Sequence, residues 1–153
     1  MNPKFRKAVF VVAYAKTKEE IKYLVLKRKY HWRGWEFPKG GINPEETKKA
    51  AAKRETLEET GEKVRRIKRF NFHGKYRYKK RLSDRKDFEG QEYSLFAAEI
   101  KFGKIKFDRM EHSGYKWLSF GDALKQLTFQ NQKKSLKIVN EWLKNHPSKE
   151  LRD

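Results

Sequence analysis

Apolar and polar residues follow two different periods along this chain. Runs rich in β-branched and aromatic residues predict strands over residues 7–15, 23–26, 64–72, 73–78, 93–100 and 115–118. Helical spacing predicts helices over 122–127 and 133–144, and in the second Leu136, Val139 and Leu143 form one apolar stripe. Segments 32–41 and 82–90 are predicted to be loops. This mixture indicates an α/β or α+β protein, and we expect one domain over residues 1–153.

The most strongly marked helix is predicted over residues 43–60. Asn43 can cap its first turn, Pro44 suits the first helical position, and Glu46 stands three residues after the cap. Gly61 follows the last turn, where a left-handed residue often ends a helix. On such a helix Glu46 would point away from Glu55, which lies nine residues further on.

The composition fits a folded protein without cysteine chemistry. Hydrophobic residues make up 37% and aromatic residues 14% of the chain, which is enough to close a small core. Cysteine is absent, which excludes disulfides and thiolate metal sites. No run is long enough to span a bilayer, and residues 1–10 lack the apolar core of a signal peptide. We therefore expect a cytoplasmic protein without membrane association, and the sequence points to no protein partner.

The charge of the chain is strongly positive and unevenly distributed. The formal net charge is +19, but residues 43–62 carry −2 between two segments, 1–42 and 63–90, that carry +8 and +9. A solvated lysine-rich surface, which can accompany life at high temperature, is one explanation. A field that attracts polyanions such as nucleotides or RNA is the other.

Three carboxylates lie on one side of the predicted helix. Glu55, Glu58 and Glu59 occupy positions i, i+3 and i+4, so they repel one another unless a positive charge neutralises them. Ion pairs of Arg54 with Glu58 and of Lys63 with Glu59 are the simpler explanation. The alternative is a hard divalent cation, and carboxylate oxygens favour Mg²⁺, with Mn²⁺ as a substitute. No cluster of histidines competes for a metal, because the four are scattered: His31, His73, His112 and His146.

A glycine pair directly precedes this helix. Gly40 and Gly41 allow backbone amides to approach an anion closely, and Lys39 adds a positive charge beside them. A tight turn alone would also explain the pair. Its position next to the carboxylate helix is what favours a ligand site.

Seven positions between residues 40 and 61 together resemble the Nudix box. All the fixed residues of that pattern are present: Gly40, Glu46, Arg54, Glu55, Glu58, Glu59 and Gly61. Thr56 and Glu62 stand where the family usually has aliphatic residues, which should affect the packing of the helix. The resemblance implies an α/β/α sandwich with a mixed central sheet. It also implies an enzyme that hydrolyses a nucleoside diphosphate linked to another group.

The resemblance further implies roles for individual residues. Glu55, Glu58 and Glu59 would hold the divalent ions, with Glu55 and Glu59 as the more direct ligands. The backbone oxygen of Gly40 would add to the site. Arg54 would orient Glu55 through an ion pair, and Glu46 would be structural. Nudix enzymes often use an additional acid from a later loop as base or metal ligand. Glu111 is the candidate here, and an ordinary surface acid is the alternative.

Two Nudix groups share further features with this chain, namely the asymmetrical diadenosine tetraphosphate hydrolases and the RNA pyrophosphohydrolases. The segment from Trp35 to Pro44 resembles both, and a tyrosine near the distance of Tyr78 from Gly61 is typical of the first group. We expect a Mg²⁺-dependent enzyme that splits diadenosine tetraphosphate into ATP and AMP. Hydrolysis at an RNA 5′ end is the second expectation, and a non-catalytic RNA-binding module that retains the fold is the third.

Candidate substrate contacts lie on both sides of the helix. They are Lys39, Gly41, Tyr76, Tyr78, Lys79 and Arg81. The cations would hold phosphates, and the aromatic rings could stack on a base. Tyr76 and Tyr78 fall on one face of a strand, so packing inside the protein is the alternative to stacking.

Overall fold

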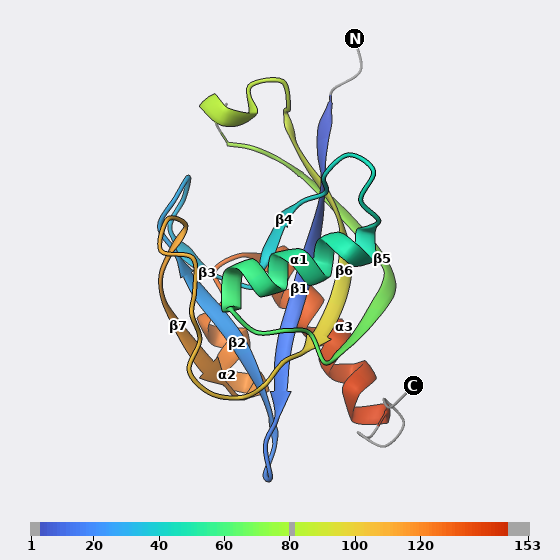
Figure 1. Cartoon of the computed structure of the whole chain (residues 1–153), viewed down its shortest axis with the longest axis vertical. Helices are drawn as coiled ribbons and strands as arrows, with labels where there is room; N and C mark the ends of the chain where they lie inside the picture. The colour runs from blue at the N-terminus through green and yellow to red at the C-terminus, as the bar shows by residue number, and fades with distance from the viewer. Residues whose placement is uncertain (1–3, 80–81, 147–153) are drawn as a thin grey trace.

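The computed structural model describes residues 4–79 and 82–146, which build one mixed β-sheet covered by helices (Figure 1). The strands are β1 (Phe5–Lys16), β2 (Ile21–Arg28), β3 (Gly34–Glu36), β4 (Lys39–Gly41), β5 (Arg66–Arg77), β6 (Gly90–Glu99) and β7 (His112–Leu118). The helices are α1 (Lys48–Thr60), α2 (Phe120–Gln126) and α3 (Gln130–Asn145), with a short 3-10 helix η1 (Ser83–Arg85). Within the described residues, no helix combines the length and apolar character needed to cross a membrane.

The sheet is organised around β1. The strand order is β3-β2-β1-β6-β5, with β4 paired to β1 and β7 paired to β2. β1 runs parallel to β6 along most of its length, and the other pairs are antiparallel. Near its start β1 pairs with β4 through Ala8–Phe10, and near its end it pairs with β2 through Tyr14–Lys16. Because β4 leads into α1, this pairing fixes where the helix begins relative to the sheet.

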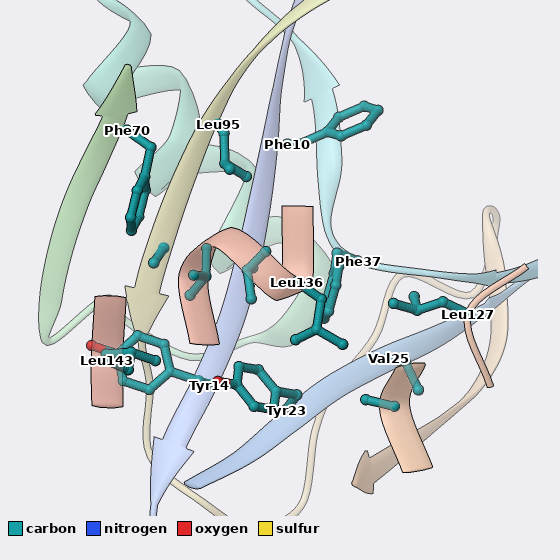
Figure 2. Close-up of a cluster of buried hydrophobic side chains, with 14 of the residues drawn as sticks. Phe10, Tyr14, Tyr23, Val25, Phe37, Phe70, Leu95, Leu127, Leu136 and Leu143 are labelled. Atoms are coloured by element: carbon teal, nitrogen blue, oxygen red, sulfur yellow. The ribbon is translucent and has the colours of Figure 1, made fainter. Parts of the chain in front are cut away.

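Alternating residues of β1 supply the cores of two separate layers. Val9 and Val11 pack with Ala51 of α1 on one face of the sheet. Phe10 lies in the larger cluster on the other face, which includes Leu136 of α3 (Figure 2). In Figure 1 helix α1 crosses the front of the sheet, whereas α2 and α3 lie behind it. The predicted α/β/α sandwich with a mixed sheet is confirmed.

Helix α1 begins later than predicted. Its N-cap is Thr47, whose hydroxyl accepts a hydrogen bond from the Ala50 N–H at 3.0 Å. Asn43 and Glu46 form a separate turn in which the Asn43 N–H donates to the Glu46 carboxylate at 3.0 Å. The left-handed φ of +68° at Glu45 interrupts the helical path between this turn and Thr47. Glu46 therefore lies before the helix, and the prediction that helical phase turns it away from Glu55 was wrong. The predicted stop at Gly61 is confirmed, with φ of +75° and an N–H that donates to the Leu57 carbonyl.

Several strands also differ from their predicted bounds. The two strands predicted over 64–72 and 73–78 form the single strand β5, with a register shift between Arg69 and His73. The segment predicted as a loop over 32–41 contains β3 and β4, which are too short to give an alternating pattern. The loop predicted over 82–90 contains η1 and ends where β6 begins.

Candidate active site

A polar cavity of about 110 Å³ opens between β1, β2, β4, β6, α1, η1 and the loop before β7. Its walls carry three carboxylates and four cationic side chains: Glu55, Glu58, Glu111, Arg6, Arg28, Lys39 and Arg85. Gly40 and Gln91 complete the lining. The sequence brings these groups together through strand pairing, because β4 and β6 both lie beside β1. Closely spaced charges of both signs in a small cavity are suited to a metal ion and a phosphate chain.

The three carboxylates of α1 lie on one ridge but differ in exposure. The Glu58 side chain is 54% exposed, that of Glu55 is 12% exposed, and that of Glu59 is 1% exposed. Glu59 Oε2 accepts a hydrogen bond from the Lys39 N–H at 2.8 Å, but its Oε1 is buried without a hydrogen-bond partner. A buried carboxylate oxygen without a donor is costly. His112 Nδ1 lies 3.7 Å from this oxygen, which is too far for a hydrogen bond.

Gly40 lies directly against the Glu55 carboxylate. A Cβ atom added at Gly40 would stand 2.1 Å from Cδ of Glu55, so the carboxylate would have to move from its present position. The glycine is therefore required by close approach and not by its backbone angles. Only a residue without a side chain leaves room for this carboxylate beside the backbone of β4.

Arg54 connects the turn before α1 to the carboxylate ridge. Its Nε and NH2 donate to the two Glu46 oxygens at 2.7 and 2.9 Å, and its NH1 donates to Glu55 at 2.7 Å and Glu58 at 3.1 Å. NH2 also donates to the Gly41 carbonyl at 2.8 Å. The structure thus contains the expected Arg54–Glu55 ion pair and also the simpler Arg54–Glu58 pair. These hydrogen bonds from Arg54 lower the pKa of Glu46 to about 2.

The predicted ion pair between Lys63 and Glu59, which both lie in the described part of the chain, is not formed. Among the described residues Lys63 forms no ion pair with Glu59, because Glu59 points into the protein while Lys63 is exposed. Neutralisation by surface lysines therefore does not explain the most buried of the three carboxylates. Arg54 does not contact Glu59 either, since its ion pairs are with Glu46, Glu55 and Glu58.

Burial and mutual repulsion set the protonation of the ridge. Burial, together with the charges of Glu58 and Glu111, raises the pKa of Glu55 to about 7 against the opposing effect of Arg54. Burial also raises the pKa of Glu59 well above its usual range, and the charges of Glu55, Glu36 and Glu111 add to this. A divalent cation among these oxygens would remove both costs. The donor set and the orphaned Glu59 oxygen therefore fit a hard metal ion.

Sequence reasoning missed a further buried carboxylate, Glu36, at the end of β3. Glu36 is completely buried and is surrounded by donors at close range: Arg28 NH1 at 3.1 Å, Trp32 Nε1 at 3.2 Å, His112 Nε2 at 2.9 Å and Lys39 Nζ at 3.5 Å. Burial alone would raise the pKa of Glu36, but Lys39, His112 and Arg28 outweigh it and hold the pKa at about 2. A lone acid between Trp35 and Phe37 was the available signal.

Glu111 comes to the cavity from the loop before β7. Its carboxylate lies 3.3 Å from Arg28 NH2, and its side chain is 28% exposed. The structure therefore brings Glu111 to the same cavity as Glu55 and Glu58, instead of leaving it on an unrelated surface. Its assignment as base or metal ligand stays a prediction.

The predicted substrate contacts are only partly at the cavity. Lys39 lines it, and burial lowers the pKa of its ammonium to about 8, although Glu36 opposes this. Gly41 does not line the cavity, because its carbonyl accepts a hydrogen bond from Arg54 and the Arg6 guanidinium covers its Cα. Lys79 is exposed and outside the lining, and Arg81 lies outside the described residues.

The two tyrosines differ in their surroundings. Their rings meet edge to face at 6.2 Å, so they lie on one side, as predicted. Tyr76 packs against the core cluster, and its hydroxyl is buried without a partner. The Tyr78 hydroxyl donates to Gln91 Oε1 at 3.0 Å, an oxygen that also accepts from Arg6 and Arg85. Tyr78 is thus beside the cavity, and Tyr76 is mainly a packing residue.

The front helix with its carboxylate ridge, the glycine strand beside it and the sandwich around them define a Nudix-type domain. The NUDIX domain model matches residues 4–138, so the chain belongs to the Nudix family.

Two curated relatives share part of this sequence. An RNA pyrophosphohydrolase of a Nitratiruptor species is 32% identical over 100 residues, which are 62% of this chain and 64% of that protein. An RNA pyrophosphohydrolase of Serratia proteamaculans is 32% identical over 111 residues, 65% of this chain and 63% of that protein. The chain therefore spans less than two thirds of the length of these relatives.

A solved structure shares the fold over nearly the whole chain. The crystal structure of a C. elegans Ap4A hydrolase (diadenosine tetraphosphate hydrolase) in a binary complex gives a TM-score of 0.73 at 24% identity. The match covers 92% of this chain and 98% of that one. This likeness concerns the fold.

Proposed function

We propose that the chain is a Mg²⁺-dependent pyrophosphohydrolase that cleaves a phosphoanhydride bond at the 5′-polyphosphate end of RNA. The observation that carries the proposal is the cavity itself, where Glu55, Glu58 and Glu111 face four cationic side chains and the buried Glu59 presents an oxygen without a partner. Hydrolysis breaks one P–O–P bond, adds the hydroxyl of water to one phosphorus and leaves the other phosphate as the departing group.

The residues of the cavity divide this chemistry between them. Glu55 and Glu59 would hold the divalent ion, with Glu58 and the Gly40 carbonyl beside them. When bound, the ion supplies positive charge to the phosphate chain and lowers the pKa of water. Arg6, Arg28, Lys39 and Arg85 neutralise the remaining phosphate charge and hold the chain in place. Glu111 accepts the proton of the attacking water.

RNA is preferred as substrate for two reasons. The curated relatives described above carry that activity in their names. In addition, the exposed alternate positions from Arg69 to Lys79 are basic apart from Asn71, and of these Arg77 pairs with Glu89 at 3.0 Å. The basic residues are Arg69, His73, Lys75, Arg77 and Lys79. Lys75 and Arg77 also lie against the Phe5 ring, with Lys75 Nζ at 4.6 Å from the ring centroid. A basic surface outside the cavity suits a polyanion longer than one nucleotide.

Diadenosine tetraphosphate, the first expectation from the sequence, is the second candidate. The observation in its favour is Tyr78, which stands beside the cavity at the spacing typical of the hydrolases of that compound. Its ring is half-buried and could stack on one adenine while the four phosphates occupy the cavity. The products would be ATP and AMP.

A side-by-side assay tests these alternatives. The full chain is incubated with RNA carrying a 5′-triphosphate and, separately, with diadenosine tetraphosphate, each with Mg²⁺ and with EDTA. We expect monophosphorylated RNA and released phosphate or pyrophosphate, with cleavage only when Mg²⁺ is present. Faster production of ATP and AMP would select the second candidate. Tight RNA binding without cleavage of either substrate would contradict the proposal and leave a non-catalytic RNA-binding module.

A further inference from the structure

The buried carboxylate Glu36 touches two side chains that each lead to a carboxylate of the proposed site. Arg28 NH1 contacts Glu36 at 3.1 Å, and NH2 of the same guanidinium contacts Glu111 at 3.3 Å. The side chains of Arg28 and Glu36 are 2% and 0% exposed, so solvent does not screen this pair. Arg28 therefore joins a fixed buried anion to an acid at the cavity.

His112 makes the second connection. Its Nε2 lies 2.9 Å from Glu36, and its Nδ1 lies 3.7 Å from Oε1 of Glu59. Both Nδ1 and Oε1 are buried, and neither has a hydrogen-bond partner. Two buried polar atoms that face each other without a hydrogen bond need a structural explanation, because each loses its contact with water. Here the contact of His112 with Glu36 fixes the imidazole ring.

Strand pairing explains why these residues meet. Arg28 and His112 are direct partners in the β2–β7 ladder, with a register shift between Lys27 and Arg28. Glu36 pairs with Leu26 in the neighbouring β2–β3 ladder. The register shift aims Arg28 differently from a regular strand, as bulges beside functional sites do. The backbone of three strands thus holds Arg28, Glu36 and His112.

We propose that Glu36 is a positioning residue that sets the places of Glu59, through His112, and of Glu111, through Arg28. The inference rests on the proposed function, because it concerns the residues that would hold the divalent ion and the attacking water. Without such an anchor, the mutual repulsion of Glu55, Glu59 and Glu111 would drive the three carboxylates apart. Glu36 remains outside the cavity and never touches substrate.

A metal ion bound by Glu36 itself is the competing interpretation. Ligand atoms of Glu36, Glu59 and His112 lie within 4.8 Å of one another, close enough to share an ion. However, Glu36 already accepts from Arg28, Trp32 and His112, with Lys39 Nζ at 3.5 Å. An ion there would have to displace cationic side chains that are themselves buried. Glu36 is therefore suited to anchoring and not to metal binding.

Substitution Glu36→Gln tests the proposal, because it keeps the shape of the side chain and removes its charge. The readout is the dissociation constant for Mn²⁺, measured by electron paramagnetic resonance on the full chain without substrate. We expect this constant to rise about tenfold or more, as for other residues that orient metal ligands. The matched control is Glu99→Gln, which alters another buried carboxylate, paired with Arg66 at 3.2 Å. That control should bind Mn²⁺ like the wild type.

Two substitutions of His112 test the connection to Glu59. In His112→Gln the amide nitrogen can take the place of Nε2 and keep the contact with Glu36, whereas in His112→Asn the amide takes the place of Nδ1. We expect each to weaken Mn²⁺ binding about tenfold. Combining Glu36→Gln with His112→Gln should cost little more than either alone, because both break one connection. The Asn variant also decides the question if Glu36→Gln does not fold, which circular dichroism would show.

The outcomes separate the inference from the function on which it rests. A folded Glu36→Gln variant with the Mn²⁺ affinity of the wild type would overturn the positioning role, even if the wild type cleaves RNA. Fully additive effects of the Glu36 and His112 substitutions would overturn the connection through His112. Failure of the wild type itself to bind Mn²⁺ would overturn the proposed function together with the inference.

Discussion

Helices α1 and α3 cover opposite faces of the same sheet, but different physical forces hold them there (Figure 1). The buried surface of α3 contains the apolar stripe Leu136, Val139 and Leu143. Figure 2 shows Leu136 and Leu143 in the buried cluster. The buried residues of α1 are small or polar: Ala51, Ala52, Glu55, Thr56, Glu59 and Thr60. Helix α3 is therefore held by burial of large apolar side chains. Helix α1 is held by a smaller apolar contact through its alanines and by hydrogen bonds to β4, such as that from the Lys39 N–H to Glu59.

This difference between α1 and α3 suggests that the two helices contribute mainly to different properties, α1 to activity and α3 to stability. Thr56 and Thr60 donate their hydroxyl hydrogens to carbonyls one turn earlier, which lets polar side chains pack where the family resemblance suggests an aliphatic residue at position 56. Burial of Glu55 and Glu59 disfavours their charged forms and raises the pKa of both carboxyls. Such a cost is expected where a ligand supplies the missing charge. Substitutions in α1 should therefore change activity, and those in α3 should change stability.

The largest effect is expected from Glu59→Gln. The amide keeps the shape of the side chain but is a poor ligand for a divalent ion, so turnover of the cleaved substrate should fall about a thousandfold. The free energy of unfolding should not fall, because burial and the neighbouring acids raise the pKa of Glu59 and already disfavour its charged form. Steady-state kinetics with Mg²⁺ and urea unfolding measure the two quantities. Glu62→Gln, just beyond the helix, is the matched control. An unchanged rate in Glu59→Gln would remove this residue from the mechanism.

On the opposite helix, Leu136→Ala should have the reverse pattern. The side chain is completely buried, and its truncation should lower the free energy of unfolding by about 2–5 kcal/mol. Turnover per folded molecule should stay at the wild-type value, because α3 does not line the cavity. Urea titration gives the stability, and Lys137→Ala, at an exposed neighbouring position, is the control. A loss of turnover in folded Leu136→Ala would break the separation of the two helices.

Gly40→Ala should reduce activity without weakening either core. The new Cβ would collide with the Glu55 carboxylate and displace it, and a displacement of about 1 Å can lower kcat/KM about a hundredfold. Thermal denaturation should show a smaller change than in Leu136→Ala. Gly121→Ala in α2 is the control, because a Cβ there meets nothing within 4 Å. Equal kinetics in both variants would show that Glu55 need not occupy its present position.

The sequence predicted residues of the candidate site only where their spacing along one helix or strand was enough to bring them together. Glu55, Glu58 and Glu59 were recognisable because they share a helix, and the glycine pair because it precedes that helix. Arg28, Glu36 and His112 belong to three strands, and their meeting depends on pairing registers that no local pattern encodes. Each of them alone resembles an ordinary structural residue.

The fold shows the same division between local and non-local information. The apolar stripe of α3 and the stop at Gly61 were visible in the sequence, since each depends on neighbouring residues. The start of α1 was not, because Asn43 and Thr47 are both good caps and the left-handed residue Glu45 selects the second. The continuity of β5 across residues 70–73 depends on its partner β6, which tolerates a register shift there.

The smallest expected effect is the release of protons from the carboxylate ridge when Mg²⁺ binds. Because the pKa of Glu55 is about 7 in the folded protein, above its ordinary value, the folded state binds more protons than the unfolded state between about pH 4.5 and 7. The contribution of this group to the stability of the metal-free protein is therefore lost as the pH rises through 7. Binding of Mg²⁺ at pH 6 should release about one proton from Glu55, and Glu59, whose pKa is also raised, should add to the number released. Titration calorimetry in buffers of different ionisation enthalpy measures this number, and heats that do not depend on the buffer would contradict it.

The most direct measurement is the anomalous density of a crystal grown with Mn²⁺. We expect a peak in contact with Oε1 of Glu59 and with the carboxylate of Glu55, beside the Gly40 carbonyl. This expectation would be contradicted by a crystal with no manganese at this ridge, in which Arg54 and neighbouring cations occupy the oxygens of all three glutamates.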